Sequence, residues 1–214
     1  MSVADYLARR WDTVLELTIE HIIAVALAVG IATVLGVLLA VLVYRSDRSV
    51  ALSLVSINVL FTVPALAFFS ILVILVGLGW TSAITVLAIY ALLPIVRNTI
   101  TGLREVDPAI VRAATGMGMS RWARLFRVEL PLAYPVIMSG IRVSTVLIVG
   151  IATIGAYVAG PGLGAELFGG LAALGTARAP AQITVGTGAV VLVALLLDAV
   201  LALITRVTTP RGLR

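Results

Sequence analysis

Few side chains in this sequence could carry out covalent chemistry or hold a metal. The chain has no cysteine and one histidine, His21. The lack of cysteine excludes disulfides, thiolate metal sites and cysteine catalysis, and a histidine metal site normally needs several ligands. No Gly-x-x-x-x-Gly-Lys-Ser/Thr segment occurs, so the chain has no P-loop for a nucleotide. The sequence therefore predicts no catalytic residue, no metal site and no cofactor held by this chain.

Polar side chains concentrate instead between Val111 and Pro131, in the stretch VRAATGMGMSRWARLFRVELP. Asp107-Pro108, just before it, is typical of a helix start, with aspartate at the cap and proline at the first helical position. Gly116 and Gly118 predict a break in this helix, because glycine adopts turn conformations without strain. Ser120 can cap a second helix. The expected shape is a helix, a glycine turn and another helix, which we call the elbow.

The second helix of the elbow is expected to end at Leu130-Pro131 and to present three arginines to water or lipid headgroups: Arg121, Arg124 and Arg127. A chain that crosses a bilayer has no structural need for such a segment between two spans. The stretch therefore favours a cytoplasmic elbow that another protein binds. The alternative is an ordinary amphipathic loop lying on the membrane surface.

The composition is that of an integral membrane protein. Hydrophobic residues make up 61% of the 214 residues and charged residues 12%, against about 45–50% and about 25% in soluble domains. The mean hydropathy is +1.18. The polar stretches are too short for a separate soluble core, so one all-α membrane domain is predicted.

Five spans are expected, because a spanning helix needs about 20 apolar residues. They lie within a transmembrane region 22–206, after an external segment 1–21 and before a cytoplasmic tail 207–214. A cytoplasmic loop 97–131 contains the elbow. The predicted spans are roughly 22–44, 52–76, 82–96, 132–158 and 183–205.

The arginines predict the orientation of these spans. All fifteen basic residues are arginine, and eleven of them fall between the first and second spans, between the third and fourth spans, or after the last span. Positive charge collects on the cytoplasmic side. The N-terminus is therefore expected outside and the C-terminus in the cytoplasm. The glycine-rich stretch 160–180 lies outside in this topology, and we expect a re-entrant or interfacial helix with glycine turns there.

Two charges fall inside the expected spans, namely Arg142 in the fourth and Asp198 in the fifth. Each costs at least about 2.5 kcal/mol at mid-membrane, so a partner or access to water is expected. Their similar distance from the cytoplasmic side predicts that they pair. Separate snorkelling of the two side chains toward the interface is the alternative.

Other polar groups in the spans have two interpretations. Asn58, Thr62 and Pro64 in the second span are candidates for lining a pathway, because proline can kink a helix and free a carbonyl; helix–helix packing is the alternative. Aromatic residues could contact a quaternary ammonium group or simply pack at the membrane interface; these are Trp80, Tyr90 and Tyr157. His21 is expected to be interfacial, at the outer edge of the first span.

The elbow resembles the conserved cytoplasmic loop of bacterial ABC-importer permeases. That family pattern is Glu-Ala-Ala, three residues, Gly, nine residues, and Ile-x-Leu-Pro. This chain has Ala113-Ala114, Gly118 and Val128-Glu129-Leu130-Pro131 at the same spacing. Val128 replaces isoleucine, and Arg112 stands where the family has glutamate. The second change reverses a charge, so an ion pair made by the family's glutamate is not expected here.

Further segments resemble the osmoprotectant branch of this family, which imports glycine betaine, carnitine, choline or proline betaine. The matching segments are Thr18–His21, Thr62-Val63-Pro64, Leu93–Thr99, Gly116–Met119, Gly140-Ile141-Arg142 and Thr209–Gly212.

The resemblance implies the type I importer permease fold in a bacterial plasma membrane. It also implies a second permease subunit, identical or related, two cytoplasmic ATPase subunits that bind ATP and magnesium, and an extracytoplasmic solute-binding protein. Each ATPase would receive a coupling helix, here about Ile110–Met119. Residues implied in that contact are Arg112, Ala113, Ala114, Gly116, Met117, Gly118 and Met119.

Two other functions compete with this interpretation. A stand-alone secondary transporter or channel would favour inverted repeats and intramembrane coupling charges, and no convincing repeat is present. An intramembrane enzyme would need a catalytic constellation that the sequence lacks. Nothing in the arginine distribution requires a nucleic-acid partner.

Overall fold

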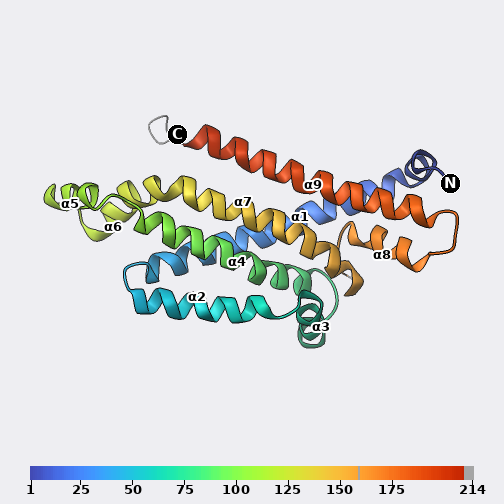
Figure 1. The fold of residues 1–214 in the computed structure, drawn as a ribbon, viewed down its shortest axis with the longest axis horizontal. Coiled ribbons are helices and arrows are strands. Elements are labelled where there is room, and N and C mark those ends of the chain that lie inside the picture. Colours follow the sequence, from blue (N-terminus) through green and yellow to red (C-terminus); the bar gives the residue numbers. More distant parts are fainter. Residues whose placement is uncertain (159, 210–214) are drawn as a thin grey trace.

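The computed structural model describes residues 1–158 and 160–209, and every regular element in these ranges is a helix (Figure 1). The molecule is elongated. The first helix begins at one end, the last helix ends toward the other, and the elbow projects at that second end. The α-helices in chain order are α1 Val3–Val43, α2 Asp47–Thr62, α3 Ala65–Val76, α4 Trp80–Arg104, α5 Pro108–Gly116, α6 Arg121–Arg124, α7 Leu130–Gly155, α8 Gly164–Ala172 and α9 Ala179–Thr208. A π-helical turn, Leu125–Glu129, joins α6 to α7, and a 3-10 turn, Ala156–Val158, follows α7.

Helix α1 includes most of the segment that we expected to precede the first span. Ser2 and Asp5 form a capping box at its start, which satisfies free backbone N–H groups. The helix is kinked at Arg10, where φ is −124° and ψ is 15°. At 41 residues, α1 is about 60 Å long. It is therefore longer than a bilayer requires, and it links the two ends of the molecule.

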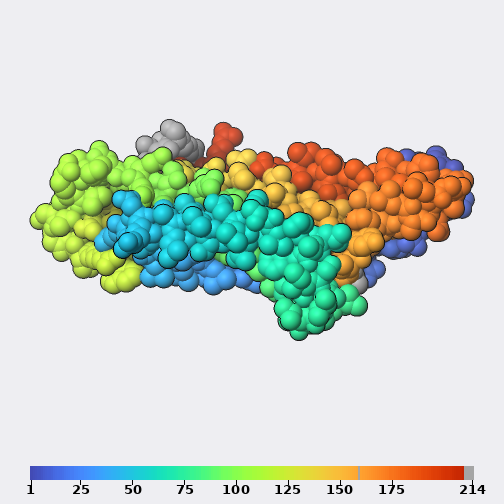
Figure 2. Space-filling view, turned by 60° about the horizontal axis from the view of Figure 1, so that its bottom comes forward, coloured from blue at the N-terminus to red at the C-terminus, as the bar shows by residue number. Residues whose placement is uncertain are grey.

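The second predicted span is broken into α2 and α3, which meet at 90°. The residue before a proline avoids the helical conformation, and Val63, before Pro64, has φ −66° and ψ 128°. The Tyr90 hydroxyl donates to the Val63 carbonyl, which the break leaves without a helical partner. Phe61 and Phe68 pack around the same ring, at 5.6 and 6.1 Å between centroids. Figure 2 shows the α3 region projecting from the body of the molecule.

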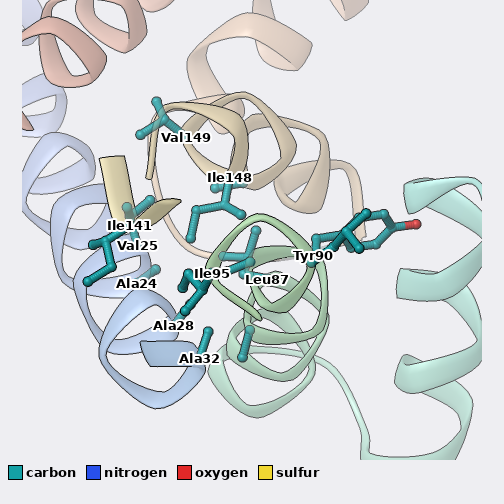
Figure 3. Packing of buried hydrophobic residues seen from close by; sticks show 14 of the residues in the cluster. Ala24, Val25, Ala28, Ala32, Leu87, Tyr90, Ile95, Ile141, Ile148 and Val149 are labelled. Atoms are coloured by element: carbon teal, nitrogen blue, oxygen red, sulfur yellow. The ribbon is translucent and has the colours of Figure 1, made fainter. Parts of the chain in front are cut away.

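Helices α4 and α7 form the centre of the molecule. The small residues Ala24, Ala28 and Ala32 of α1 are fully buried and face α4, where Leu87 and Ile95 are buried as well (Figure 3). Small side chains let membrane helices approach closely. A Cβ atom added at Gly140 of α7 would lie 2.8 Å from a backbone oxygen of α4. The core therefore depends on close backbone contact.

Two boundaries of the central helices differ from the prediction. Helix α4 continues to Arg104, eight residues beyond the predicted end at 96. Arg97 is exposed, while Thr99, Ile100 and Leu103 pack inward, so a charged residue on one side does not end the helix. The other difference is at Leu130-Pro131, which begins α7 and does not end the preceding helix. Proline is tolerated in a first helical turn.

The last third of the chain follows the prediction more closely. Helix α8 lies in the glycine-rich stretch for which a re-entrant or interfacial helix was expected, and α9 covers the fifth predicted span. Four of the described helical segments are long and apolar enough to cross a membrane, or five if the bent α2–α3 pair is one span. The predicted tail 207–214 lies mostly outside the described residues, as do Arg211 and Arg214.

The close contact at Gly140 predicts a strong penalty for a single methyl group there. Gly140→Ala would push against Asn98 and the Pro94 carbonyl, whereas a Cβ at Gly150 of the same helix meets no atom within 4 Å. Overpacking costs about 1–3 kcal/mol, and both changes gain similar helix propensity. Thermal unfolding in detergent should therefore give a lower midpoint for Gly140→Ala than for Gly150→Ala. Equal midpoints would contradict the close packing of α4 and α7.

Candidate functional site

The first helix of the elbow, α5, begins as the sequence predicts. The Asp107 carboxylate accepts a hydrogen bond of 2.7 Å from the Ala109 N–H, and Pro108 is the first helical residue. Ala114 is buried, at 2% exposed. Arg112 and Ala113 are exposed. One face of α5 therefore packs on the elbow and the other is open.

The turn after α5 depends on one glycine. Gly118 has φ +78°, and a Cβ there would meet no atom within 4 Å. Its N–H donates to the Thr115 carbonyl at 3.0 Å, and the Met119 N–H donates to the Ala114 carbonyl at 3.2 Å. Gly116, by contrast, is the last residue of α5 and does not have a positive φ. The predicted glycine break is thus a requirement of Gly118 alone, because only there is the backbone left-handed.

The second helix of the elbow begins at Ser120, whose hydroxyl accepts from the Ala123 N–H at 3.2 Å. The exposed side chains beyond it are large and apolar. Trp122 is 59% exposed, and it stacks on Phe126 with 6.2 Å between ring centroids. Met117, in the turn, is 71% exposed. The elbow therefore presents an apolar and basic surface at the tip of the molecule.

A buried carboxylate holds the elbow to the rest of the molecule. Glu129 is 3% exposed. It accepts hydrogen bonds from Arg124 Nε at 2.7 Å, from Arg45 Nη2 at 3.3 Å and from the Tyr44 hydroxyl. Arg124 Nη1 also donates to Thr115 Oγ1 of α5 at 2.7 Å. We call these residues the elbow cluster: Tyr44, Arg45, Thr115, Arg124 and Glu129.

The elbow cluster corrects the prediction for Arg124. Arg121 and Arg127 are exposed as expected, but the Arg124 side chain is only 16% exposed. A buried carboxylate is stable only when it is paired and hydrogen-bonded. Arg124 Nε pairs with Glu129, and Arg124 Nη1 donates a hydrogen bond to Thr115 and so holds α5 in place. It therefore acts inside the elbow and does not face water.

Sequence reasoning missed Tyr44, Arg45 and Glu129 as members of a cluster. The only local signal is the position of Glu129, four residues from Leu125 and four from Ala133, which are both buried. Residues four apart share a helix face, so Glu129 lies on the same face as these two buried residues. A further ion pair, Arg104 Nη1 to Asp47 Oδ1 at 2.9 Å, joins α4 to the start of α2.

A second buried carboxylate lies at the opposite end of the molecule. Glu166 of α8 is 2% exposed, accepts a hydrogen bond from the Tyr6 hydroxyl and lies 3.5 Å from Arg10 Nη2. Tyr6 and Arg10 belong to the start of α1, while Tyr44 and Arg45 follow its end. Each end of α1 is therefore fastened by one tyrosine and one arginine to a buried glutamate.

The remaining residues of the predicted coupling motif differ in exposure. No hydrogen bond or ion pair joins Arg112 to another residue in the described ranges. Met119 is half-buried. At the other end of the motif, Val128 and Leu130 are half-buried and Pro131 is exposed.

Of the predicted pathway residues, Thr62 and Pro64 lie at the break in the second span, and Asn58 lies four residues earlier in α2. Asn58 is half-buried, Pro64 is exposed, and the Thr62 hydroxyl donates to the Val59 carbonyl at 2.7 Å. The aromatic residues do not come together. Tyr90 is buried beside the break, whereas Tyr157 pairs with Phe168 at 5.2 Å between centroids.

Trp80, at the start of α4, is 38% exposed. His21 is fully buried, contrary to the expected interfacial position, because the Gly162 backbone covers it.

Arg142 and Asp198 are brought together by α7 and α9. Arg142 Nε and Nη2 each donate to one carboxylate oxygen of Asp198, both at 2.9 Å. This bidentate arrangement is the strong geometry for an arginine–carboxylate pair.

Together, the long apolar helices and the polar elbow are those of a multi-pass membrane protein with a polar segment projecting at one end. The chain belongs to the family of binding-protein-dependent transport system inner membrane components, whose model matches residues 32–210.

Three similar proteins align with 91–100% of this chain. The glycine betaine/carnitine/choline transport system permease protein OpuCB of Bacillus subtilis is 36% identical, over 91% of this chain and 88% of its own length. The choline transport system permease protein OpuBB of the same organism is 35% identical, over 99% and 96%. The osmoprotectant import permease protein OsmW of Salmonella typhimurium is 36% identical over 100% of both chains.

The fold is also that of a solved transporter chain. A structure of the MetNI methionine ABC transporter in an inward-facing conformation matches with a TM-score of 0.77 and 22% identity, over 92% of this chain and 96% of that one. The arrangement of helices described above is thus that of the type I importer permease fold.

The elbow cluster predicts that Arg124 protects the elbow from proteolysis. Arg124→Gln removes the bonds to Glu129 and Thr115, whereas Arg127→Gln removes an exposed arginine, and each variant loses one tryptic site. Hydrogen bonds to charged groups contribute about 1.5–3 kcal/mol each, so the elbow of Arg124→Gln should be cut by trypsin about tenfold faster than that of Arg127→Gln. Gel analysis of purified protein measures this, and equal rates would show that the cluster does not hold the elbow.

Proposed function

We propose that this chain is the permease subunit of an ATP-driven importer for compatible solutes, and that the elbow couples it to separate ATPase subunits. Family membership and the similarity to osmoprotectant permeases support the transport part of the proposal. The observation that carries the coupling part is the elbow itself. It presents an exposed α5 and a left-handed turn at Gly118, and it is held to the ends of α1 and α7 by buried ion pairs.

The proposed coupling follows from that connection. A force applied to α5 by an ATPase reaches Arg124 through the Thr115 hydroxyl, and reaches Tyr44 and Arg45 through Glu129. The bonds to Glu129 lie in a buried or partly buried site, where charged hydrogen bonds resist separation more than exposed ones do. The elbow would therefore move with the spans as one body. Exposed Met117 supplies an adaptable apolar contact for a partner surface.

The proposed assembly has three kinds of subunit. Two permeases, identical or related, would enclose the pathway. Two ATPases would hold ATP and magnesium, and an external binding protein would deliver the solute. The family's name, which refers to binding-protein-dependent transport, supports the last of these. Arg112, in place of the family's glutamate, would meet a different charge on its ATPase or leave that contact to a related second permease.

The names of the similar proteins suggest the class of solute. Their names give glycine betaine, carnitine and choline, which are small solutes with a quaternary ammonium group. We propose that this chain serves the same class.

Gly118→Trp tests the coupling proposal. A bulky side chain at this left-handed position strains the turn and blocks the proposed contact. The variant should insert normally but lose association with its ATPase, and stimulated ATP hydrolysis should fall by about tenfold or more, as expected when a central interface contact costs about 2 kcal/mol. Co-purification from membranes and ATPase assays measure both effects.

Gly175→Trp is the matched control, because Gly175 also has a positive φ, meets no atom within 4 Å and follows α8 at the other end of the molecule. It should keep the ATPase bound. Normal ATPase association and transport by Gly118→Trp would refute the coupling assignment.

A further inference from the structure

The ion pair between Arg142 and Asp198 lies deep within the helices that carry it. Arg142 is twelve residues after the start of α7 at Leu130 and thirteen before its end at Gly155. Asp198 is ten residues before the end of α9 at Thr208. At about 1.5 Å per residue, both lie roughly 15–18 Å from the helix ends near the elbow. Both charges are therefore placed where a bilayer would be apolar.

The side chains of this pair are partly exposed, unlike the buried carboxylates of Glu129 and Glu166 at the two ends of the molecule. The side chains of Arg142 and Asp198 are 37% and 36% exposed, while those of Glu129 and Glu166 are 4% and 2% exposed. Charges facing hydrocarbon cost about 2.5–3.5 kcal/mol each, and such residues usually face a water-filled path. A purely structural pair would be better covered. The open position indicates that water or a polar solute reaches it.

A hollow of about 590 Å³ surrounds the pair between α7 and α9. Besides the two charges, its lining combines one hydroxyl with small and branched apolar side chains: Ser139, Val143, Val146, Ala194 and Leu195. A site with opposite charges on one wall and apolar groups on the others complements a small molecule that carries both charges and several methyl groups.

We propose that this hollow, the charge-pair site, is a solute site in the transport pathway, and that it favours zwitterions with a carboxylate and a quaternary ammonium over solutes that are only cationic. The inference rests on the proposed function and deepens it. Arg142 would take the carboxylate with its planar fork. Asp198 would take the ammonium by charge, and Val143, Val146 and Leu195 would contact its methyl groups.

The preference follows from charge balance. A zwitterion that inserts between the two side chains gives each of them a new partner, so neither charge is left alone. A cation satisfies Asp198 but leaves Arg142 without its carboxylate, and an unpaired charge within a membrane-spanning helix is costly. Arg142 and Asp198 already bind each other, so a solute must displace this interaction in order to bind. Its binding is therefore weak, and the solute can dissociate again.

The chain's lack of cysteine allows a direct test in the assembled transporter. Ser139→Cys places a thiol in the lining of the charge-pair site, and Leu27→Cys places one on an exposed apolar position of α1, 47% exposed. The complete complex is reconstituted in proteoliposomes and treated with a small hydrophilic thiol reagent, and labelling of this chain is followed by mass spectrometry. Uptake of glycine betaine and of choline is measured on the same preparations.

The proposal predicts that Cys at 139 reacts about tenfold or more faster than Cys at 27, because a hydrophilic reagent does not enter lipid. Glycine betaine should slow the reaction at 139 about fivefold or more, and choline less than about twofold, since only the zwitterion pairs both charges. Adding Arg142→Gln should remove the protection by glycine betaine. The first two results require no change in the ion pair, so they stand even if that variant fails to assemble.

Three results would overturn the charge-pair site: no reaction at position 139, equal protection by glycine betaine and choline, or unchanged protection after Arg142→Gln. These are separable from a failure of the proposed function. If the unmodified complex takes up neither solute, the proposed substrate class is wrong, whatever the labelling shows. If it takes up glycine betaine while the labelling shows no protection, only the charge-pair site is wrong.

Discussion

The burial of Glu129 is the constraint on which the rest of the elbow depends. A carboxylate that is 3% exposed must be matched by donors, and the donors come from two directions. Tyr44 and Arg45 come from the end of α1, and Arg124 comes from the elbow. The hydrogen bonds to Glu129 therefore fix the position of the elbow relative to α1. The hydrogen bond from Arg124 to Thr115 extends this constraint to α5.

A second buried glutamate binds the opposite end of α1. Glu166 is bound by Tyr6 and Arg10, so α1 is fastened at both ends while its alanines pack closely on α4 between them. Helix α1 therefore contacts the elbow at one end and α8 at the other, in each case through a buried carboxylate.

Local signals in the sequence were sufficient for the local structure of the elbow. Asp107, Ser120 and Gly118 each act within a few residues, and each is found in the predicted role. Arg142 and Asp198 were paired through their similar depth, which a topology alone can supply. Signals that depend on distant partners were not sufficient. Arg124 looked like a surface arginine because Glu129 points inward only once α7 is packed, and His21 looked interfacial because the backbone that covers it is far along the chain.

The broken second span shows the same limit. Pro64 predicted a kink, but the right angle between α2 and α3 also depends on the Tyr90 hydroxyl, which occupies the carbonyl freed at Val63. Helix α4 passed its predicted end because its inward face stays apolar beyond Arg97. In both cases the packing of a neighbouring helix decided an outcome that one segment's own composition left open.

The central claim is that the elbow is the part of this chain that contacts the ATPase. It can be tested most directly by cross-linking from Met117, which is 71% exposed in the turn. In a chain without other cysteines, Met117→Cys carrying a short photo-activated cross-linker should join this chain to the ATPase subunit in native membranes. Leu27→Cys carrying the same reagent should not. Cross-links from position 117 to lipid alone, with the ATPase present and active, would contradict the account.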